Sequence, residues 1–177
     1  MNGNRTWARQ HRLLAYRGHE YGREKLKEVI RWSIEYGLEC LTVFAFSTEN
    51  WERPKVQVSA LMRLLGLVLD DDVPALHREG VRIRVVGSRV GLKPALVAKF
   101  DAAQTLTQAN RRLLLQVCFN YGARADLVAA VEAIQRAGER VSVNQITRHL
   151  STYGSPPLDL LLRTGGDCRI SNFLLWE

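Results

Sequence analysis

The stretch LDLLLRTGGDCRISNFLLWE, Leu158 to Glu177, carries the strongest signals for the fold. Its apolar run Leu158 to Leu162 ends at a turn with two glycines, and short apolar runs bounded by turn residues are typical of buried strands. Arg163, Arg169 and Ser171 follow the run, and guanidinium groups match phosphate oxygens. The stretch therefore predicts a phosphate site at the carboxyl end of a strand. Composition alone is about equally consistent with a simpler alternative, in which the two arginines form ordinary ion pairs at the surface.

The length and composition are those of one soluble domain. A chain of 177 residues is long enough to bury a sizeable core, and 46% hydrophobic with 24% charged residues is ordinary for a globular protein. The sequence has no apolar run long enough to cross a bilayer and no signal pattern at its amino terminus. These features predict a cytoplasmic protein.

The net charge of +7 predicts an anionic partner, which composition leaves open between nucleic acid, a membrane surface and a phosphorylated substrate. Nucleic acid is disfavoured, because the arginines are dispersed through loops without a basic stripe or a pattern of stacking aromatic residues. The three cysteines, Cys40, Cys118 and Cys168, are odd in number and far apart, which argues against a disulfide framework and a zinc cluster.

Strand and helix patterns alternate along the chain. The predicted strands are 39–46, 81–87, 113–119 and 158–162, and the predicted helices are 20–36, 54–78, 94–109, 125–137 and 143–150. Such alternation favours an α/β domain with a mostly parallel central sheet flanked by helices, because parallel strands need crossover helices. Polar clusters follow three of the strands, at 47–53, 120–124 and 163–171. We expect them to converge at the carboxyl edge of the sheet, where ligands bind in such folds.

Two segments have simpler alternatives. The opening 1–18 is rich in arginine and asparagine and is expected to be irregular, either as an anion-binding loop or as a frayed terminus. The acidic run Asp70 to Asp72 points around a helix rather than at one ion, which favours a solvated face over a magnesium site. Pro74, just after this run, is expected to kink the helix.

Several motifs, in order and spacing, resemble those of the cis-prenyltransferase family, the family of undecaprenyl diphosphate synthase. They are Met1 to Asn4 with Trp7 and Ala8, Gly18 with His19, FAFSTENWERP from Phe44 to Pro54, Asn120 to Gly122, and RTGGDCRISNFLLW from Arg163 to Trp176. The resemblance covers nearly the whole chain. It implies a single α/β domain over residues 1–177 and a transferase that condenses isopentenyl diphosphate with an allylic diphosphate such as farnesyl diphosphate.

The resemblance also implies roles for individual residues. Isopentenyl diphosphate would be bound by Arg163, Arg169 and Ser171. The groups that position substrate and assist proton removal would be Ser47, Asn50 and Arg53, with Phe46 and Trp51 shaping an apolar wall. The allylic diphosphate loop would comprise Gly3, Asn4, Arg5, Trp7 and His19. The family uses Mg²⁺, works as a homodimer or with a homologous partner, and makes an apolar product, which implies peripheral membrane association.

The chain departs from the family pattern at both ends. Asn2 occupies the position of the family's catalytic, metal-binding aspartate, and an amide there is expected to bind Mg²⁺ weakly because it lacks the charge. The family has a strand before its first motif and a segment after Trp176, and the domain is expected to lack both. Weak or lost activity is therefore expected. The alternative is a non-catalytic accessory paralogue that binds isoprenoid diphosphate or partners an active subunit.

Overall fold

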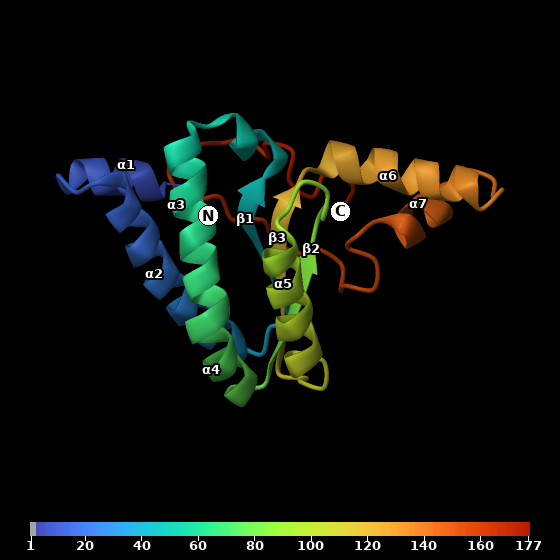
Figure 1. Cartoon of the computed structure of the whole chain (residues 1–177). Coiled ribbons are helices and arrows are strands. Elements are labelled where there is room, and N and C mark those ends of the chain that lie inside the picture. The colour runs from blue at the N-terminus through green and yellow to red at the C-terminus, as the bar shows by residue number, and fades with distance from the viewer. Residues whose placement is uncertain (1–2) are drawn as a thin grey trace.

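The computed structural model describes residues 3–177 and shows an α/β architecture around a three-stranded sheet (Figure 1). The strands are β1 (Cys40–Ser47), β2 (Val81–Val86) and β3 (Leu113–Tyr121), in the order β1-β3-β2 with both pairs parallel. The central strand β3 is mostly buried along its length, as expected for a strand covered on both faces. The α/β class and the parallel sheet predicted from the sequence are confirmed.

Helices provide the crossovers and cover the sheet. They are α1 (Asn4–Gln10), α2 (Ala15–Glu35), α3 (Lys55–Leu67), α4 (Val73–Arg78), α5 (Pro94–Thr107), α6 (Ala123–Arg136) and α7 (Val143–His149), with a 3₁₀ turn η1 (Thr48–Glu52) and a π-helical turn η2 (Val68–Asp72). Figure 1 shows α1, α2 and α3 on one side of the sheet and α6 and α7 on the other. The opening segment was predicted to be irregular, and this was wrong, because α1 and the start of α2 occupy most of it.

A bulge interrupts β1 just before the end that carries polar residues. Phe44 pairs with Cys118 and Phe46 with Phe119, so Ala45 is an additional residue on the β1 side. Bulges bend a strand and redirect its side chains, and they are frequent beside active sites. Here the bulge turns Phe46 into the core, where its ring stacks on Phe119 at a centroid distance of 5.1 Å.

The predicted strand at Leu158 to Leu162 is not formed. These residues are irregular, and the side chains of Leu160 and Leu162 are 70% and 80% exposed. An apolar run records a preference for burial, but a strand also needs a neighbouring strand to complete its hydrogen bonds. None of the described residues gives this segment such a ladder.

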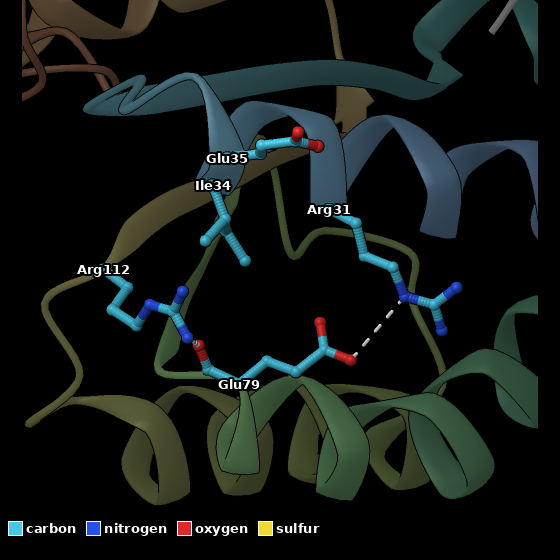
Figure 2. A pocket seen from close by; sticks show the side chains of 5 residues that line it. All are labelled: Arg31, Ile34, Glu35, Glu79 and Arg112. Carbon is cyan, nitrogen blue, oxygen red and sulfur yellow. Dashed lines mark hydrogen bonds and ion pairs between the residues drawn. The ribbon is translucent and has the colours of Figure 1, made fainter.

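A hollow of about 390 Å³ lies at the amino ends of the strands, opposite the predicted site (Figure 2). Its lining includes Ile34 from α2, Glu79 before β2 and Arg112 before β3. Arg31 forms an ion pair of 3.8 Å with Glu79, and Arg112 donates to the Glu79 carbonyl oxygen. The hollow is thus separated from the carboxyl edge of the sheet by the length of the strands.

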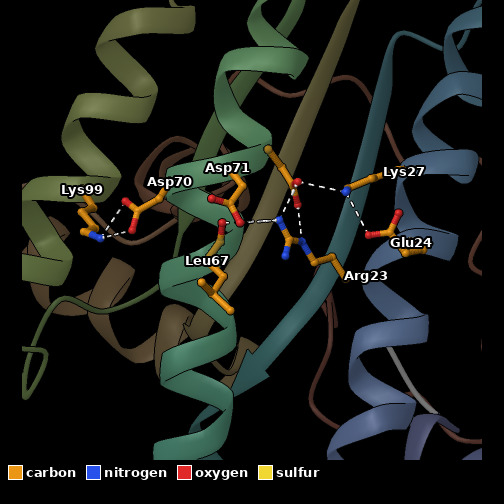
Figure 3. Close-up of polar contacts among 8 residues, drawn as sticks. Arg23, Glu24, Lys27, Leu67, Asp70, Asp71 and Lys99 are labelled. Carbon is orange, nitrogen blue, oxygen red and sulfur yellow. Dashed lines mark hydrogen bonds and ion pairs between the residues drawn. The ribbon is translucent and has the colours of Figure 1, made fainter.

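A partly buried ion cluster joins α2 to η2 (Figure 3). Arg23 donates to both carboxylate oxygens of Asp72 at 2.6 and 2.7 Å, and Lys27 lies 3.0 Å from the same carboxylate. The expectation of a solvated acidic face was therefore wrong for Asp72, which is 7% exposed, whereas Asp70 and Asp71 are exposed. Burial opposes ionisation of Asp72, but hydrogen bonds from Arg23 and Lys27 outweigh it and hold its pKa below the ordinary value.

The helix predicted for 54–78 is interrupted by the π-helical turn η2, which comes just before Pro74. Pro74 lies in the first turn of α4, directly after the π-helical turn η2. The widened π-helical turn just before it rotates the following residues, which brings Asp72 towards Arg23. The single helix predicted for 54–78 is therefore three helical segments.

Replacing Asp72 with asparagine is expected to lower the free energy of unfolding by about 2 kcal/mol at neutral pH, because it leaves Arg23 and Lys27 without their shared carboxylate. The folded-state pKa of Asp72 is depressed, so its contribution is complete above the ordinary value of 3.8 and is lost as pH falls through the folded-state pKa. Urea unfolding at neutral and acidic pH measures this. Equal stability of the two proteins at neutral pH would contradict the assignment.

Candidate functional site

Asn172 connects segments that are far apart in sequence at the carboxyl edge of the sheet. Its side-chain Nδ2 donates to Glu49 Oε1 at 2.6 Å, and its Oδ1 accepts from the Arg124 N–H at 2.8 Å. Its carbonyl oxygen accepts from the Ala123 N–H at 2.9 Å. The backbone φ of +61° is one that asparagine tolerates better than most residues. Asn172 therefore holds the turn 163–171 against the ends of β1 and β3.

The predicted phosphate-binding residues of this turn form one cluster. Arg163 donates to Ser171 Oγ at 2.9 Å and to Asp167 Oδ2 at 3.1 Å, and Arg169 donates to the same Asp167 oxygen at 3.2 Å. The Arg163 side chain is 18% exposed, and its Nε is a buried donor without a hydrogen-bond partner among the described residues. Two guanidinium groups thus share one carboxylate, which leaves a net positive charge at the turn.

The end of β1 presents a second set of ordered polar groups. The Ser47 N–H donates to Asn50 Oδ1 at 3.3 Å, while the Ser47 side chain accepts from the Asn50 backbone, so the two residues form a capping box. The Trp51 Nε1–H donates to Asn120 Oδ1 at 2.7 Å, and its ring lies edge-to-face on Phe46 at 4.9 Å. Trp51 therefore forms an apolar wall that is backed by the buried Phe46 ring and held to the end of β3 through Asn120.

The N-terminal loop reaches the same place because small residues allow close backbone contact. A Cβ on Gly3 would lie 3.2 Å from the Gly165 Cα, so the loop and the glycine turn are in contact. A Cβ on Gly18 would lie 2.1 Å from the Asn4 carbonyl oxygen, which shows how closely α1 packs on α2. Asn4 Nδ2 lies 3.4 Å from His19 Nδ1, which positions the imidazole beside the loop.

Basic groups are concentrated around His19. Burial lowers the pKa of His19, and the positive charges of Arg53 and Arg5 lower it further. Burial also lowers the pKa of Arg53, with a smaller contribution from Arg5. Like charges repel unless an anion lies between them, so this half of the site is suited to a polyanionic ligand.

The sequence analysis assigned no role to Asn172 and Glu49, and it noted Asn120 only within a polar cluster and a family motif. Burial disfavours ionisation of Glu49, but hydrogen bonds led by that from Asn172 hold its pKa below the ordinary value. Asn120 has a φ of +50° and donates to the Ser88 carbonyl oxygen at 3.0 Å. A sequence signal for Asn120 and Asn172 was available. Asparagine tolerates left-handed backbone, and such backbone is common where a strand ends or a turn follows.

The structure gives no support for the predicted site roles of Trp7 and Asn2. The Trp7 ring stacks on His11 at 4.2 Å and packs against Tyr21 at 4.8 Å, so its described contacts are on the outer side of α1 and α2. Asn2, predicted as a catalytic and metal-binding residue, lies outside the described residues. Within residues 3–177 no group of three or more histidine, cysteine or acidic side chains is arranged to hold a metal ion.

Comparison with known proteins agrees with this arrangement. A family model described as "Putative undecaprenyl diphosphate synthase" matches residues 1–177. This chain belongs to that family. The isoprenyl transferase of Agrobacterium fabrum is 40% identical over all of this chain and 74% of its own length. The ditrans,polycis-undecaprenyl-diphosphate synthase of Pseudomonas aeruginosa, described as specific for (2E,6E)-farnesyl diphosphate, is 41% identical over 73% of its length.

Solved structures show the same fold. Lavandulyl diphosphate synthase from Lavandula x intermedia, in complex with dimethylallyl diphosphate, aligns with a TM-score of 0.93 at 30% identity, over 99% of this chain and 79% of that one. A probable undecaprenyl diphosphate synthase from Campylobacter jejuni aligns with a TM-score of 0.82 at 29% identity, over 86% and 74% of the two chains. The family and the transferase class predicted from the sequence are confirmed, so the chain is a cis-prenyltransferase that elongates prenyl chains.

Replacing Asn172 with alanine is expected to lower the free energy of unfolding by about 2 kcal/mol, because the Arg124 N–H and the Glu49 carboxylate both lose a hydrogen-bond partner. Asn144→Ala on the exposed face of α7 is a matched control with an expected change below about 0.5 kcal/mol. Thermal or urea unfolding of both variants measures the difference. Similar stabilities would mean that Asn172 does not hold these segments together.

Proposed function

We propose that this chain condenses isopentenyl diphosphate with an allylic diphosphate such as farnesyl diphosphate. One observation carries the proposal: the Arg163 turn, the end of β1 and the N-terminal loop meet at one edge of the sheet, through the Asn172–Glu49 hydrogen bond and the Gly3–Gly165 contact. A condensation of two diphosphates needs two adjacent anion-binding surfaces. Two basic groups are suited to those roles: the turn with Arg163 and Arg169, and the arginines around His19.

The turn is assigned to isopentenyl diphosphate. The Arg163 and Arg169 guanidinium groups carry the donors that diphosphate oxygens need, and Ser171 adds a hydroxyl already hydrogen-bonded to Arg163. The diphosphate would compete with Asp167 for both arginines. Asp167 therefore keeps the guanidinium groups in position when substrate is absent.

The N-terminal side is assigned to the allylic diphosphate. The Gly3 and Asn4 backbone, Arg5, Trp7 and His19 were predicted for this role, and Arg53 adds its positive charge to that of Arg5 near His19. As the allylic carbon–oxygen bond breaks, negative charge grows on the leaving diphosphate, and positioned cationic donors stabilise that charge. The neutral His19 ring can then act through hydrogen bonds without a competing charge of its own.

The end of β1 is assigned to the reacting isoprenoid carbons. Trp51, backed by the buried Phe46 ring, provides an apolar wall that would shield a carbocation-like chain from water. Ser47 and Asn50 have fixed orientations through their capping box, which suits them to positioning the isopentenyl group and assisting removal of its proton. These roles follow from the resemblance, and the ordered geometry supports them.

The proposal also covers the metal cofactor, the oligomeric state and the cellular location of the protein. Mg²⁺ is proposed as the cofactor, but the described residues form no acidic site for it, so no catalytic step is assigned to the ion. A homodimer, or a heteromer with a homologue, is proposed and can be measured by light scattering. No helix among the described residues is long and apolar enough to span a bilayer, and a cytoplasmic location with peripheral membrane contact remains our proposal.

The test separates binding from turnover. Binding of isopentenyl diphosphate and of farnesyl diphosphate is measured separately by calorimetry, and each is expected to bind when the other is absent. Product is then measured with and without Mg²⁺. Failure of either diphosphate to bind would contradict the two-part site, whereas binding of both without product would favour the non-catalytic accessory protein.

A further inference from the structure

The turn between α1 and α2 is a protruding surface with an unusual composition. All nine residues from Arg9 to Arg17 are exposed, and the structure places α1 and the start of α2 at one outer side of the molecule, away from α6 and α7 (Figure 1). We call residues 9–17 the basic turn. Its position leaves it accessible to a large partner without rearrangement of the sheet.

The charge of the basic turn is of one sign. It contains Arg9, Arg12 and Arg17, and no aspartate or glutamate occurs before Glu20. Glu20 forms an ion pair of 2.7 Å with Arg17. Among the described residues, Arg9 and Arg12 take part in no ion pair, so their charges are free to interact with an anionic partner.

Apolar side chains lie between these arginines and face solvent. Leu13, Leu14 and Tyr16 are 38%, 67% and 51% exposed. Exposed leucines carry a free-energy cost in water that is recovered when they enter an apolar phase. Arginine flanking leucine and an aromatic residue is the composition of segments that lie in the headgroup region of anionic bilayers.

The backbone holds the basic turn in a fixed shape. The Leu13 N–H donates to the Ala8 carbonyl oxygen at 2.8 Å, and the Arg17 N–H donates to the Leu14 carbonyl oxygen at 3.0 Å. Arg12 has a φ of +56°, a left-handed conformation that reverses the chain between the helices. The leucines are therefore exposed by a defined turn, so binding requires little additional ordering.

We propose that the basic turn docks this protein on a bilayer that contains anionic phospholipids, with Leu13 and Leu14 inserted and Arg9 and Arg12 at the headgroups. The paired leucines at this outer turn favour a bilayer over nucleic acid, because an apolar phase is what exposed leucines prefer. This inference rests on the peripheral membrane contact proposed for the protein, names the surface that makes it, and does not depend on turnover. The N-terminal loop that begins α1 also contacts the Gly165 turn, so docking would bring the site close to the membrane surface.

The test is flotation of the full chain with vesicles of phosphatidylcholine alone and of phosphatidylcholine mixed with phosphatidylglycerol. We expect binding to the anionic vesicles only. Each of the single variants Arg9→Ala and Arg12→Ala should lower the vesicle partition coefficient about fivefold. The pair Leu13→Ser with Leu14→Ser should lower it roughly tenfold or more.

The opposite end of the molecule offers matched controls. Arg136→Ala with Arg140→Ala removes the same charge at the end of α6 and just after it, and Val141→Ser with Val143→Ser removes exposed apolar side chains there. Both control proteins are expected to bind as the parent does. Equal losses in control and basic-turn variants, or unchanged binding of the leucine variant, would overturn the proposal. So would binding to single-stranded DNA that depends on the same arginines and is tighter than binding to anionic vesicles.

Discussion

Replacing Arg163 with alanine is expected to reduce the affinity for isopentenyl diphosphate roughly a hundredfold. Charge-assisted hydrogen bonds to a buried guanidinium contribute about 1.5–3 kcal/mol each, and Arg163 can offer a diphosphate more than one. The side chain is mostly buried and already oriented by Ser171 and Asp167, so little ordering is needed on binding. Calorimetry with isopentenyl diphosphate measures the change.

The variant also removes hydrogen bonds that shape the turn, so its effect on folding must be separated from its effect on binding. Arg163→Lys keeps the charge but loses the planar fork, and it is expected to recover only part of the affinity. Arg136→Ala, an exposed arginine at the end of α6, is the control and should bind as the parent does. Undiminished binding of isopentenyl diphosphate by a folded Arg163→Ala protein would refute the assignment of this turn.

Replacing Gly18 with alanine is expected to weaken binding of the allylic diphosphate tenfold or more, by roughly 1.4 kcal/mol, while isopentenyl diphosphate still binds. The added Cβ would lie 2.1 Å from the Asn4 carbonyl oxygen and 3.0 Å from the Ala8 Cβ, so α1 must move away from α2. That movement displaces Asn4 from His19 and Gly3 from the Gly165 turn. Separate titrations with farnesyl diphosphate and isopentenyl diphosphate measure the two affinities.

Gly66→Ala provides a matched control, because Gly66 also lies in a helix but has open space where a Cβ would be placed. Alanine is favoured over glycine within helices by about 1 kcal/mol, so this control should be as stable as the parent or more stable. If both variants bind farnesyl diphosphate like the parent, the close packing of α1 on α2 does not position the allylic site. If Gly18→Ala loses both ligands equally, the two halves are not separable.

Much of the fold was predictable because its elements have strong local signals. The strands around Val43 and Leu115 are mostly apolar runs, whereas the strand around Ile83 alternates before it becomes apolar, and each lies within two residues of its predicted boundaries. The convergence of polar clusters at the strand ends followed from the parallel arrangement. The contact between the Ser47–Arg53 segment and the 163–171 turn, made through Asn172 and Glu49, agrees with that expectation.

The failures share a physical cause, which is that the decisive partner is distant in sequence. Leu158 to Leu162 has the composition of a strand but no strand beside it among the described residues. Asp72 resembles its exposed neighbours, and only the π-helical turn and Arg23 on another helix make it a buried ion pair. The sequence alone does not distinguish the role of Asn172 from those of other polar residues of the turn. Its role depends on a left-handed backbone and on three hydrogen bonds to distant segments.

The most direct test of the account is incorporation of radiolabelled isopentenyl diphosphate into extractable product with farnesyl diphosphate, with and without Mg²⁺, using this chain and its Arg163→Ala and Gly18→Ala variants. The account predicts labelled product from the parent chain and, at limiting substrate concentrations, much less product from both variants. Gly66→Ala should retain product formation. No product from a folded parent chain that binds both diphosphates would contradict the proposed catalysis and leave the non-catalytic accessory protein as the better description.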